Sequence, residues 1–581
     1  MVGLYSCAAR SYVYAVSAPM TDKLAVAQLL REIGLYIELK GDNRFRARAY
    51  ETGARAVEEL REELPELVAQ QRLTETRGIG PALAAVIAEI VTTGSSQQLE
   101  KLRAESPPGV IELAQVPGLT IKKIEQLHTA LGIDSVEKLR AACVSGQVRT
   151  IKGFGEKTEE KLLAALDRWE RRDARVLLVD ALEAAEPLAA YLAAHPAAQK
   201  VELAGSLRRW RETVSDIDFV VASDDAPAIV EHLAAYGRVA TVVERADRDA
   251  VVKLSDGLQV ELHVVAPPDF ATALVRATGS ATHVARLEAI GAERGVALAV
   301  PATSEREVYD RLHLAWIAPE LREDDGELEQ AGAGSLATGL ITIGDIRGMT
   351  HCHTTYSDGR NSVAEMAREA EAMGMQYLTI TDHSPAAYYA SGVELDRLQR
   401  QWDEIARVQE TTTVRLLRGT ESDILEDGAL DYPDRILEQL DVVIASIHSR
   451  LKMDPETMTR RLVNAMKQPV FKIWGHGLGR LVLKRDPIAC DVEAVLDAVA
   501  ESRAAVEING DPYRLDLAPE WVRKARERGI RFIISTDAHS TTGMHNLRFG
   551  VHTARRGWVR RGEVLNALSV EEFKRAVRPA G

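Results

Sequence analysis

The hydrophobic positions in the first third of the chain follow the period of an α-helix. Apolar side chains recur at helical spacing, for instance at Leu24, Val26, Leu29, Leu30 and Ile33. Glycine-containing turns interrupt this pattern at residues 78–81, 117–120 and 153–155, and a stretch rich in Ala, Leu, Ile and Lys follows each of them. The sequence therefore predicts an internal repeat of small helical units up to about residue 180.

From about residue 180 the pattern changes to short β-type runs separated by helices. An alanine-rich helix is expected over Val176–Ala194. Apolar and β-branched runs then predict strands at Lys200–Ala204, Ile217–Ala222, Val239–Val243, Val251–Leu254 and Val260–Val265. Strands mixed with helices in this order are typical of an α+β domain. Residues 323–344, acidic at first and then rich in Ala, Gly and Ser, are expected to form a linker.

Strands and helices alternate regularly over residues 345–581. Short apolar runs predict strands at Tyr377–Thr381, Val414–Arg418, Val442–Ile447, Phe471–Trp474, Ala505–Ile508 and Phe532–Ser535. Parallel strands need a helical crossover between them, so this alternation predicts a parallel (β/α) barrel or a barrel-like fold.

The composition is that of a globular protein. The 581 residues are 46% hydrophobic and 27% charged, and a typical domain of about 150 residues implies roughly four domains. No apolar run is long enough for a membrane helix, so no membrane contact is expected. The scattered cysteines indicate reduced thiols and a cytoplasmic location. Residues 1–19 have too weak a pattern for a signal peptide and are expected to be a disordered extension.

The charge distribution limits the ways in which this chain can bind nucleic acid. The formal net charge is −14 and the pI is about 5.6, which argues against a generic basic nucleic-acid coat protein. Basic and acidic side chains are nearly balanced in residues 1–180, whereas acidic ones predominate in residues 181–340. Any nucleic-acid contact in the first third must therefore depend on local geometry. The acidic middle region is either a metal site or a solvated surface.

Histidines and carboxylates mark the ends of nearly all the predicted strands in the last third. The set is His351, His353, Asp358, His383, Glu421, His448, His476, Asp537 and His539. In a (β/α) barrel these strand ends converge on one face, and imidazoles and carboxylates are ligands for Zn, Mn or Fe. Nine such groups exceed one tetrahedral shell. They predict a centre of two or three divalent metals, which lowers the pKa of a bound water and clamps phosphoryl oxygens.

The motifs around these residues resemble the PHP (polymerase and histidinol phosphatase) family. The matching runs are His351-Cys-His-Thr-Thr-Tyr-Ser-Asp-Gly, Thr381-Asp-His-Ser and Ser535-Thr-Asp-Ala-His-Ser, and the resemblance covers about residues 345–575. It implies that the nine residues are metal ligands, with Asp382 supporting a ligand rather than binding metal. Arg480 and Lys484, just past His476, are either contacts for a substrate phosphate or surface residues.

The acidic middle region contains the pattern of a nucleotidyltransferase. The pair Gly205-Ser206 is followed by Arg209 and then by Asp216-Ile-Asp218. A Gly-Ser turn exposes backbone amides and a hydroxyl to a triphosphate, and an arginine neutralises phosphate oxygens. The two aspartates alternate on a strand, so their carboxylates point the same way and can bridge two Mg²⁺ ions.

This constellation resembles the family X DNA polymerases, which in bacteria often carry a C-terminal PHP domain. The implied nucleotide-binding residues are Gly205, Ser206, Arg209 and Arg175. The implied catalytic carboxylates, which hold Mg²⁺ or Mn²⁺, are Asp216, Asp218 and Glu261. This chain departs from the family at Glu261, where the family has Asp, and at Arg276-Ala277, where it has Tyr-Phe. Weak polymerase activity, relaxed sugar selection and a core retained only to bind DNA ends are the alternatives that follow.

The glycine turns of the first third resemble helix–hairpin–helix motifs. The glycines are Gly78, Gly80, Gly118, Gly153 and Gly155. They let the backbone approach a DNA phosphate, to which the N–H groups at the next helix start donate. A single such turn is more often an ordinary helix C-cap. Three of them, each in a helical unit, favour DNA binding without a basic surface.

These resemblances predict a multidomain chain. The expected regions are a disordered extension (1–19), a helical DNA-end-binding domain with the first helix–hairpin–helix (20–100), a fingers-like helical region with two more (101–180), an α+β nucleotidyltransferase palm (181–265), a thumb (266–322), a linker (323–344) and a distorted (β/α) barrel of PHP type (345–581).

Three functions remain open on this basis. The first is a DNA-repair enzyme, expected to be monomeric, that adds deoxynucleoside triphosphates at gapped or nicked DNA and removes 3′ nucleotides or processes 3′ ends in its PHP domain. The second is a DNA-end nuclease or phosphatase whose polymerase core is weak or inactive and serves to bind DNA. The third is a small-molecule PHP phosphatase, against which the hairpin repeats argue.

Overall fold

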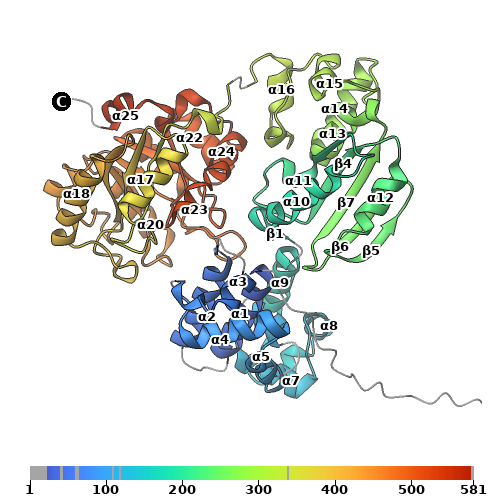
Figure 1. Cartoon of the computed structure of the whole chain (residues 1–581), viewed down its shortest axis with the longest axis horizontal. Helices are drawn as coiled ribbons and strands as arrows, with labels where there is room; N and C mark the ends of the chain where they lie inside the picture. The colour runs from blue at the N-terminus through green and yellow to red at the C-terminus, as the bar shows by residue number, and fades with distance from the viewer. Residues whose placement is uncertain are drawn as a thin grey trace, which may run out of the picture. The chain divides into compact units, whose positions relative to one another are not determined.

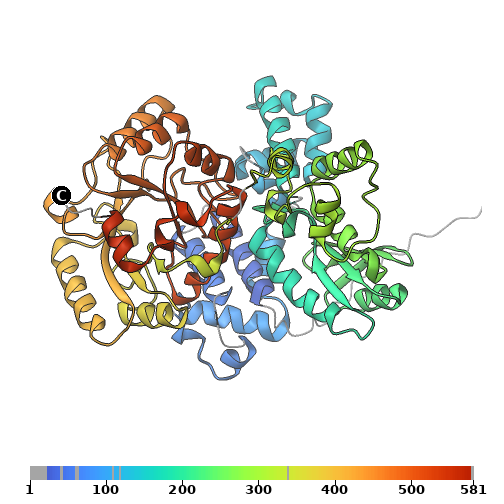
Figure 2. The same ribbon diagram turned by 90° about the horizontal axis from the view of Figure 1, so that it is seen from above.

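The computed structural model describes residues 23–39, 44–58, 60, 64–76, 78–106, 110–116, 119–173, 175–336 and 339–577. The expected extension at residues 1–19 and the candidate residue Gly118 lie outside these ranges. The chain divides into two compact units, Met1–Ala174 and Arg175–Gly581, drawn in Figures 1 and 2. Within the described ranges every helix is too short or too polar to span a bilayer.

The first unit is built from short helices around one core. The helices are α1 (Lys23–Leu39), α2 (Arg44–Glu58), α3 (Leu64–Ala69), α4 (Pro81–Thr93), α5 (Gln97–Ala104), α6 (Val110–Gln115), α7 (Ile121–Leu131), α8 (Val136–Val144) and α9 (Glu156–Asp173). Val26, Leu30 and Ile33 share one face of α1 and are fully buried. Because one continuous hydrophobic core runs from α1 to α9, no helix of this unit packs in isolation.

The described glycine turns lie directly before helices. Gly80 is the N-cap of α4, Thr120 is the N-cap of α7, and Gly155 directly precedes α9. Gly78 and Gly153 have φ values of +94° and +98°, a left-handed conformation that glycine adopts without strain. An added Cβ at Gly80 or Gly155 meets nothing within 4 Å, so the space beside both glycines is open.

The second unit begins with a five-stranded mixed sheet. Its spatial order is β2 (Lys200–Leu203), β4 (Asp216–Ala222), β7 (Gln259–Val265), β6 (Asp249–Leu254) and β5 (Val239–Arg245). Only β4 and β7 are parallel neighbours. Its helices are α10 (Leu178–Ala193), α11 (Gly205–Arg208) and α12 (Ala226–Ala234). The helix expected from Val176 starts at Leu178, because the two residues before it form β1 (Val176–Leu177), which pairs with β3 (Thr213–Val214).

A group of helices follows this sheet. They are α13 (Phe270–Thr278), α14 (Ala281–Glu293), α15 (Glu305–Arg311) and α16 (Glu327–Gly332), with 3₁₀ turns η3 (Pro267–Asp269) and η4 (Pro319–Leu321). They share a hydrophobic core that includes Val275, Leu287 and Leu328. Helix α16 lies within residues 323–344, so part of this segment packs into the core that α13 to α15 build.

The remainder of the second unit is a nearly closed parallel barrel. The strands, in spatial order, are β14 (Phe532–Ser535), β13 (Ala504–Asn509), β12 (Lys472–Trp474), β11 (Val442–Ser446), β10 (Arg415–Asp423), β9 (Tyr377–Ile380) and β8 (Gly348–Met349). All neighbours are parallel. A parallel bridge between Cys352 and Ala538 brings the two outer strands together beyond their ends. The predicted distorted barrel is confirmed, although the two-residue strand β8 is too short to show a period in the sequence.

Helices lie outside these strands, as Figures 1 and 2 show. They are α17 (Val363–Ala372), α18 (Leu395–Gln409), α19 (Asp434–Leu437), α20 (Pro455–Met466), α21 (Val492–Ala500), α22 (Pro519–Glu527), α23 (Thr541–Met544), α24 (Leu547–Arg556) and α25 (Val570–Val577), with 3₁₀ turns η5 (Ile343–Asp345), η6 (Tyr388–Ala390), η7 (Arg561–Glu563) and η8 (Leu565–Ala567). The longer helices bury an apolar stripe, as α18 does with Leu398, Trp402 and Ile405.

The sheet and the barrel pack against each other within the second unit. The Trp210 ring stacks on His552 of α24, with ring centroids 3.6 Å apart and planes inclined by 5°. Leu515 and Phe549, which belong to the barrel sequence, are buried in the hydrophobic core of the sheet. The two regions therefore share part of one core.

Candidate active sites

The carboxyl ends of the barrel strands bring the nine predicted side chains to one face. His351, His353 and Asp358 follow β8, His383 follows β9, Glu421 lies in β10, His448 follows β11, His476 follows β12, and Asp537 and His539 follow β14. Strands that all run in the same direction end on the same side of a barrel, so these distant positions meet. Glu421 is inside its strand because β10 continues to Asp423, beyond the predicted end at Arg418.

The carboxylate of Glu421 lies at the centre of this cluster and is completely buried. Its Oε1 is 2.7 Å from His476 Nε2 and 3.2 Å from His448 Nε2. Its Oε2 is 2.9 Å from His383 Nδ1 and 3.4 Å from His353 Nε2. A carboxylate with imidazoles around both oxygens has the geometry to bridge two cations.

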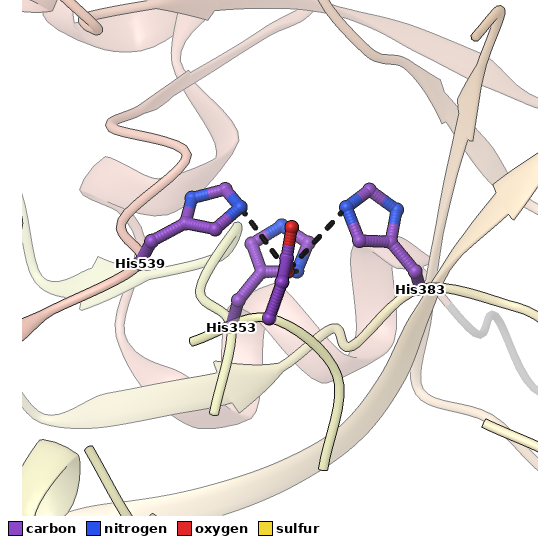
Figure 3. A group of neighbouring side chains, drawn as sticks. His353, His383 and His539 are labelled. Atoms are coloured by element: carbon purple, nitrogen blue, oxygen red, sulfur yellow. Dashed lines mark ion pairs between the residues drawn. The ribbon is translucent and has the colours of Figure 1, made fainter. Parts of the chain in front are cut away.

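Ligand atoms that lie within 4.8 Å of one another form three overlapping groups in the described part of the chain. The groups are His353, Asp358, His383 and His539; His351, His353, Glu421 and Asp537; and His383, Glu421 and His448. Figure 3 shows the imidazoles of His353, His383 and His539 turned toward one another. His476 joins the groups through Glu421. All nine predicted residues thus belong to one continuous cluster.

Several buried atoms of this cluster have no hydrogen-bond partner. They are His351 Nε2, His353 Nε2, His383 Nδ1 and Glu421 Oε2. An unpaired buried polar group costs roughly 1–3 kcal/mol, so several of them at one point are expected only where something else satisfies them. Imidazole nitrogen and carboxylate oxygen are the donors that Zn, Mn and Fe accept, and the residues present therefore fit a divalent metal centre.

Burial and neighbouring charges hold His353 and Glu421 in metal-binding protonation states. The surrounding carboxylates raise the pKa of His351, His448 and His539, so these rings release a proton when a metal binds. Burial, together with the nearby His539 and His383, lowers the pKa of His353 to about 4, so its ring is neutral at physiological pH. Burial opposes the charged form of Glu421, but His383, His448 and His351 outweigh it and hold the pKa of Glu421 well below its usual value. Neutral imidazole and ionised carboxylate are the forms that coordinate metals.

Two carboxylates that the sequence analysis did not single out orient the histidines. Glu507 Oε1 is 2.6 Å from His351 Nδ1, and Asp423 Oδ1 is 2.6 Å from His448 Nδ1. A carboxylate bonded to one ring nitrogen turns the other toward the metal position. Glu507 lies on β13, which carries no predicted ligand, and a buried acidic residue between Val506 and Ile508 was the available signal.

Asp382 holds the loop between His353 and Asp358. Its carboxylate accepts hydrogen bonds from the Thr354 backbone N–H at 2.7 Å, from Ser357 Oγ at 2.5 Å and from Gln401 Nε2 at 2.7 Å. Because both oxygens accept hydrogen bonds, Asp382 stabilises this loop. It lies outside the three groups of ligand atoms.

The cationic side chains near the cluster are arranged differently from what we expected. Arg480 donates to Glu212 at 2.7 Å and is mostly buried, so it is not available to a substrate phosphate. The Lys484 ammonium lies 5.6 Å from the centre of the Tyr513 ring. The cation that reaches the cluster is Arg514, whose Nε lies 3.5 Å from Asp537 Oδ2. Its motif, Asn-Gly-Asp-Pro-Tyr-Arg after β13, was not considered in the sequence analysis.

The second candidate site lies on the parallel strands β4 and β7. Glu261 stands directly opposite Asp218 in the strand register, and Asp216 is two residues earlier on the same strand as Asp218. Gly205 begins α11 with φ +58°, and a Cβ added there would lie 1.6 Å from Asp218 Oδ2. Only glycine permits this approach, so the Gly-Ser turn and the aspartates form one closely packed site.

The carboxylates of this second site repel one another. Burial, and then Asp216 and Glu261, raise the pKa of Asp218 to about 7. In the described chain these three do not form a group of ligand atoms within 4.8 Å, unlike the barrel side chains. Carboxylates that destabilise one another's charge are stabilised when a cation binds between them. Glu261 is therefore close enough to act on Asp218 electrostatically in spite of its longer side chain.

The candidate phosphate-binding residues of this site are only partly free. The buried Ser206 hydroxyl has no hydrogen-bond partner. Arg209 donates to Glu323 Oε1 at 2.9 Å and to the Thr278 carbonyl at 2.8 Å. Arg175 donates to Thr213 Oγ1 at 2.8 Å. Arg209 must thus give up its ion pair with Glu323 before it can bind a phosphate. Arg175 instead stabilises β3 through its hydrogen bond to Thr213.

Comparison with known proteins identifies the N-terminal helical regions and the C-terminal barrel of this chain. Residues 22–96 match a helix-hairpin-helix domain, residues 110–168 match a SAM-like helix-hairpin-helix tandem, and residues 350–510 match a PHP domain. The DNA polymerase/3′-5′ exonuclease PolX of Bacillus subtilis is 36% identical over 567 residues, which cover 95% of this chain and 98% of that protein. The chain belongs to the family X DNA polymerases with a C-terminal PHP domain.

Other relatives of this family X polymerase match about a third of its chain. A probable phosphatase of Caldanaerobacter subterraneus is 33% identical over 208 residues, which cover 33% of this chain and 75% of that protein. A probable phosphatase of Thermoanaerobacter sp. is 32% identical over 203 residues, which cover 33% of this chain and 78% of that protein. About a third of this chain is thus similar to proteins named as probable phosphatases.

The glycines predicted to contact DNA lie in the helix-hairpin-helix regions of the polymerase. Gly78 and Gly80 fall within the first matched region, and Gly153 and Gly155 fall within the second. All four precede helix starts, where unpaired backbone N–H groups favour an anion.

Proposed function

We propose that this protein is a DNA-repair enzyme that fills gaps with deoxynucleoside triphosphates and removes 3′ nucleotides with its PHP domain. The observation that carries this proposal is the presence of two separate acidic sites in one chain, combined with near full-length similarity to a protein named DNA polymerase/3′-5′ exonuclease. Gapped or nicked DNA is its proposed substrate. A monomeric state and a cytoplasmic location remain predictions from the sequence.

In the PHP domain, the proposed ligands of two or three Mn²⁺, Zn²⁺ or Fe²⁺ ions are His351, His353, Asp358, His383, Glu421, His448, His476, Asp537 and His539. Bound there, such ions supply an activated water and charge stabilisation for a phosphate ester. Glu507 and Asp423 keep the ring nitrogens of His351 and His448 in the binding tautomer. Arg514 attracts the anionic DNA backbone toward Asp537.

In the palm, Asp216, Asp218 and Glu261 are the proposed carboxylates for Mg²⁺ or Mn²⁺. The raised pKa of Asp218 supports this role, because cation binding removes the repulsion that causes it. Ser206, whose buried hydroxyl is unpaired, and the Gly205 turn are proposed to bind the triphosphate. Arg209 joins them when the incoming phosphates displace Glu323, and Arg175 contributes by holding β3 beside the site.

A second candidate is a DNA-end nuclease or phosphatase whose polymerase core is inactive and binds DNA. Glu261 in place of Asp and the ion pair that occupies Arg209 favour it. A small-molecule phosphatase is disfavoured, because it leaves the helix-hairpin-helix regions without a role.

The decisive experiment compares two double variants on two substrates. Asp216→Ala with Asp218→Ala should lose primer extension on gapped DNA by at least about 100-fold and keep 3′–5′ degradation. His351→Ala with His353→Ala should show the reverse. Glu261→Asp, a matched conservative variant, should extend at least as well as the parent protein, since it restores the shorter arm found in the family.

Two outcomes would contradict parts of this proposal. Loss of both activities in both double variants would mean that the two sites are not independent. Failure of the parent protein and of Glu261→Asp to extend a primer with either Mg²⁺ or Mn²⁺, while degradation persists, would favour the second candidate.

A further inference from the structure

Two aromatic side chains stand exposed beside the PHP cluster. Tyr388 is 86% exposed and Tyr389 is 58% exposed. They are consecutive residues of the 3₁₀ turn η6, in the loop that follows His383. Their rings lie 6.0 Å apart at an interplanar angle of 79°. Large apolar rings exposed side by side indicate a binding surface rather than a packing requirement.

The backbone around these rings is held firmly. Ala387 and Ala390, which flank the two tyrosines, are 0% and 2% exposed. Gly392 donates its N–H to the Ala387 carbonyl at 3.1 Å, and Val393 donates its N–H to the His383 carbonyl at 2.8 Å. The exposure of the rings is therefore imposed by an anchored turn and does not result from a loose loop.

Tyr389 lies against the cluster. Its ring centroid is 6.3 Å from that of His383 and 6.1 Å from that of His448. The ring therefore borders the cluster at the histidines that follow β9 and β11.

The opening of the cluster to solvent is limited. The side chains of His539 and Asp358 are 38% and 36% exposed, whereas those of His351, His353 and Glu421 are fully buried. A phosphodiester therefore has to enter where His539 and Asp358 are accessible. A ring close to the centre and exposed on its outer side is suited to contact the nucleoside attached to that phosphodiester.

We propose that Tyr389, with Tyr388 beside it, stacks on the base of the 3′-terminal nucleotide while its phosphodiester occupies the metal centre. This inference rests on the proposed exonuclease function. Every base has a π-face, so stacking on tyrosine is tolerant of sequence. A base inside a duplex is already stacked and paired, and it must leave the helix before it can meet the ring. The pair of rings therefore selects frayed, mispaired or single-stranded 3′ ends.

The main test uses the full-length protein and two 5′-labelled single-stranded oligonucleotides. One ends in a normal 3′ nucleotide, and the other ends in a 3′ tetrahydrofuran residue that has no base. Tyr389→Ala should lower kcat/KM roughly 5- to 150-fold on the normal end, the range expected for one lost base-stacking contact. It should change kcat/KM less than about twofold on the baseless end.

Control variants separate stacking from other roles of the ring. Tyr389→Phe keeps the ring and should stay within about threefold of the parent protein on both ends. Ile343→Ala, which removes a 53% exposed apolar side chain from another turn of the same unit, should behave like the parent protein. If Tyr389→Phe falls as far as Tyr389→Ala, the hydroxyl acts in the reaction and stacking is wrong. Equal losses on both ends would show that the ring only supports the centre, which also overturns the proposal.

A binding measurement keeps this inference separate from the exonuclease function. An oligonucleotide with 2-aminopurine at its 3′ end is titrated with the protein in EDTA, so that no cleavage occurs. Stacking predicts quenching of the 2-aminopurine fluorescence by the parent protein and by Tyr389→Phe, and its loss in Tyr389→Ala. Quenching without any nuclease activity would refute the proposed function and leave the stacking contact intact. Absence of quenching in the parent protein would overturn the contact itself.

Discussion

Individual residues of the two sites show opposite responses to burial. At His353, burial and neighbouring imidazoles lower the pKa to about 4 and keep the ring neutral. At Asp218, burial and neighbouring carboxylates raise the pKa to about 7, so the group is only partly ionised near neutral pH when no cation is present. The two shifts have different consequences for metal binding. The imidazole is ready to coordinate, and the carboxyl releases a proton when a cation binds.

The raised pKa of Asp218 predicts a pH-dependent loss of stability without metal. A carboxyl that holds its proton more tightly when folded stabilises the protein fully below its ordinary pKa of 3.8, and this contribution disappears as the pH rises through about 7. Asp218→Asn does not titrate. We compare the free energy of unfolding of Asp218→Asn with that of the parent protein in EDTA. The advantage of the variant should be larger at pH 8 than at pH 4, by on the order of 2–4 kcal/mol. Thermal unfolding at both pH values measures this difference, and an equal effect of the substitution at both would contradict it.

Single elements carry the other functional features. The turns before α4 and α9 present open space at Gly80 and Gly155, and the turn η3 before α13 follows β7, the strand that holds Glu261. Strand β10 is longer than its apolar run, because its buried polar residues Thr420, Glu421 and Ser422 continue the ladder to β11. Hydrophobic pattern alone ends the strand too early, and the central carboxylate of the cluster is then assigned to a loop.

The open turns allow a test of DNA binding that leaves the fold almost unchanged. Alanine at Gly80 places a methyl group between the backbone N–H groups and an approaching phosphate, and it should weaken binding to gapped DNA by about 3- to 10-fold, the effect of one lost hydrogen bond. Its cost in stability should stay below about 1 kcal/mol. Fluorescence anisotropy and thermal unfolding measure the two quantities.

Gly237→Ala is the matched control for this test. Gly237 also has nothing within 4 Å of an added Cβ, and it belongs to the second unit, just before β5. The variant Gly237→Ala should not change DNA affinity. Unchanged binding in both Gly80→Ala and Gly155→Ala would rule out the backbone contacts proposed for these turns.

At the scale of the whole molecule, the mixed sheet, the helices α13 to α16 and the PHP barrel form one compact unit. Trp210 stacks on His552 and lies against Phe549, and Arg480 of the barrel is paired with Glu212 of the palm. Trp558 of the barrel sequence is buried in the core of the thumb. These shared contacts indicate that residues 175–577 unfold together.

The shared core predicts the number of thermal transitions. Calorimetry of the full-length protein should resolve at most two, one for each compact unit. Trp210→Ala removes the ring between palm and barrel, and it should destabilise the larger unit by about 3 kcal/mol and split its transition in two. A larger unit that already unfolds in two steps in the parent protein would contradict the prediction.

Much of this architecture was predictable from sequence. Strand and helix periods predicted the barrel and the mixed sheet, and the glycine turns predicted the helical repeats, since each is a short-range pattern of hydrophobicity or backbone freedom. The nine histidines and carboxylates could be singled out because each follows or ends an apolar strand. Arg514 could not, because nothing in its local sequence distinguishes it from a structural residue, and for Glu507 the acidic side chain between Val506 and Ile508 was the available signal.

The amino-acid sequence by itself determined the family, the barrel and the residues that make up the histidine and carboxylate cluster, because these depend on motifs and on the ends of strands. Only the tertiary structure decided that Glu421 lies at the centre of the cluster and that Arg480 binds Glu212 and not a phosphate. It also decided that Tyr388 and Tyr389 remain exposed beside the cluster. Such features depend on the distances in space between side chains that the closed barrel brings together. Separation along the chain does not predict those distances.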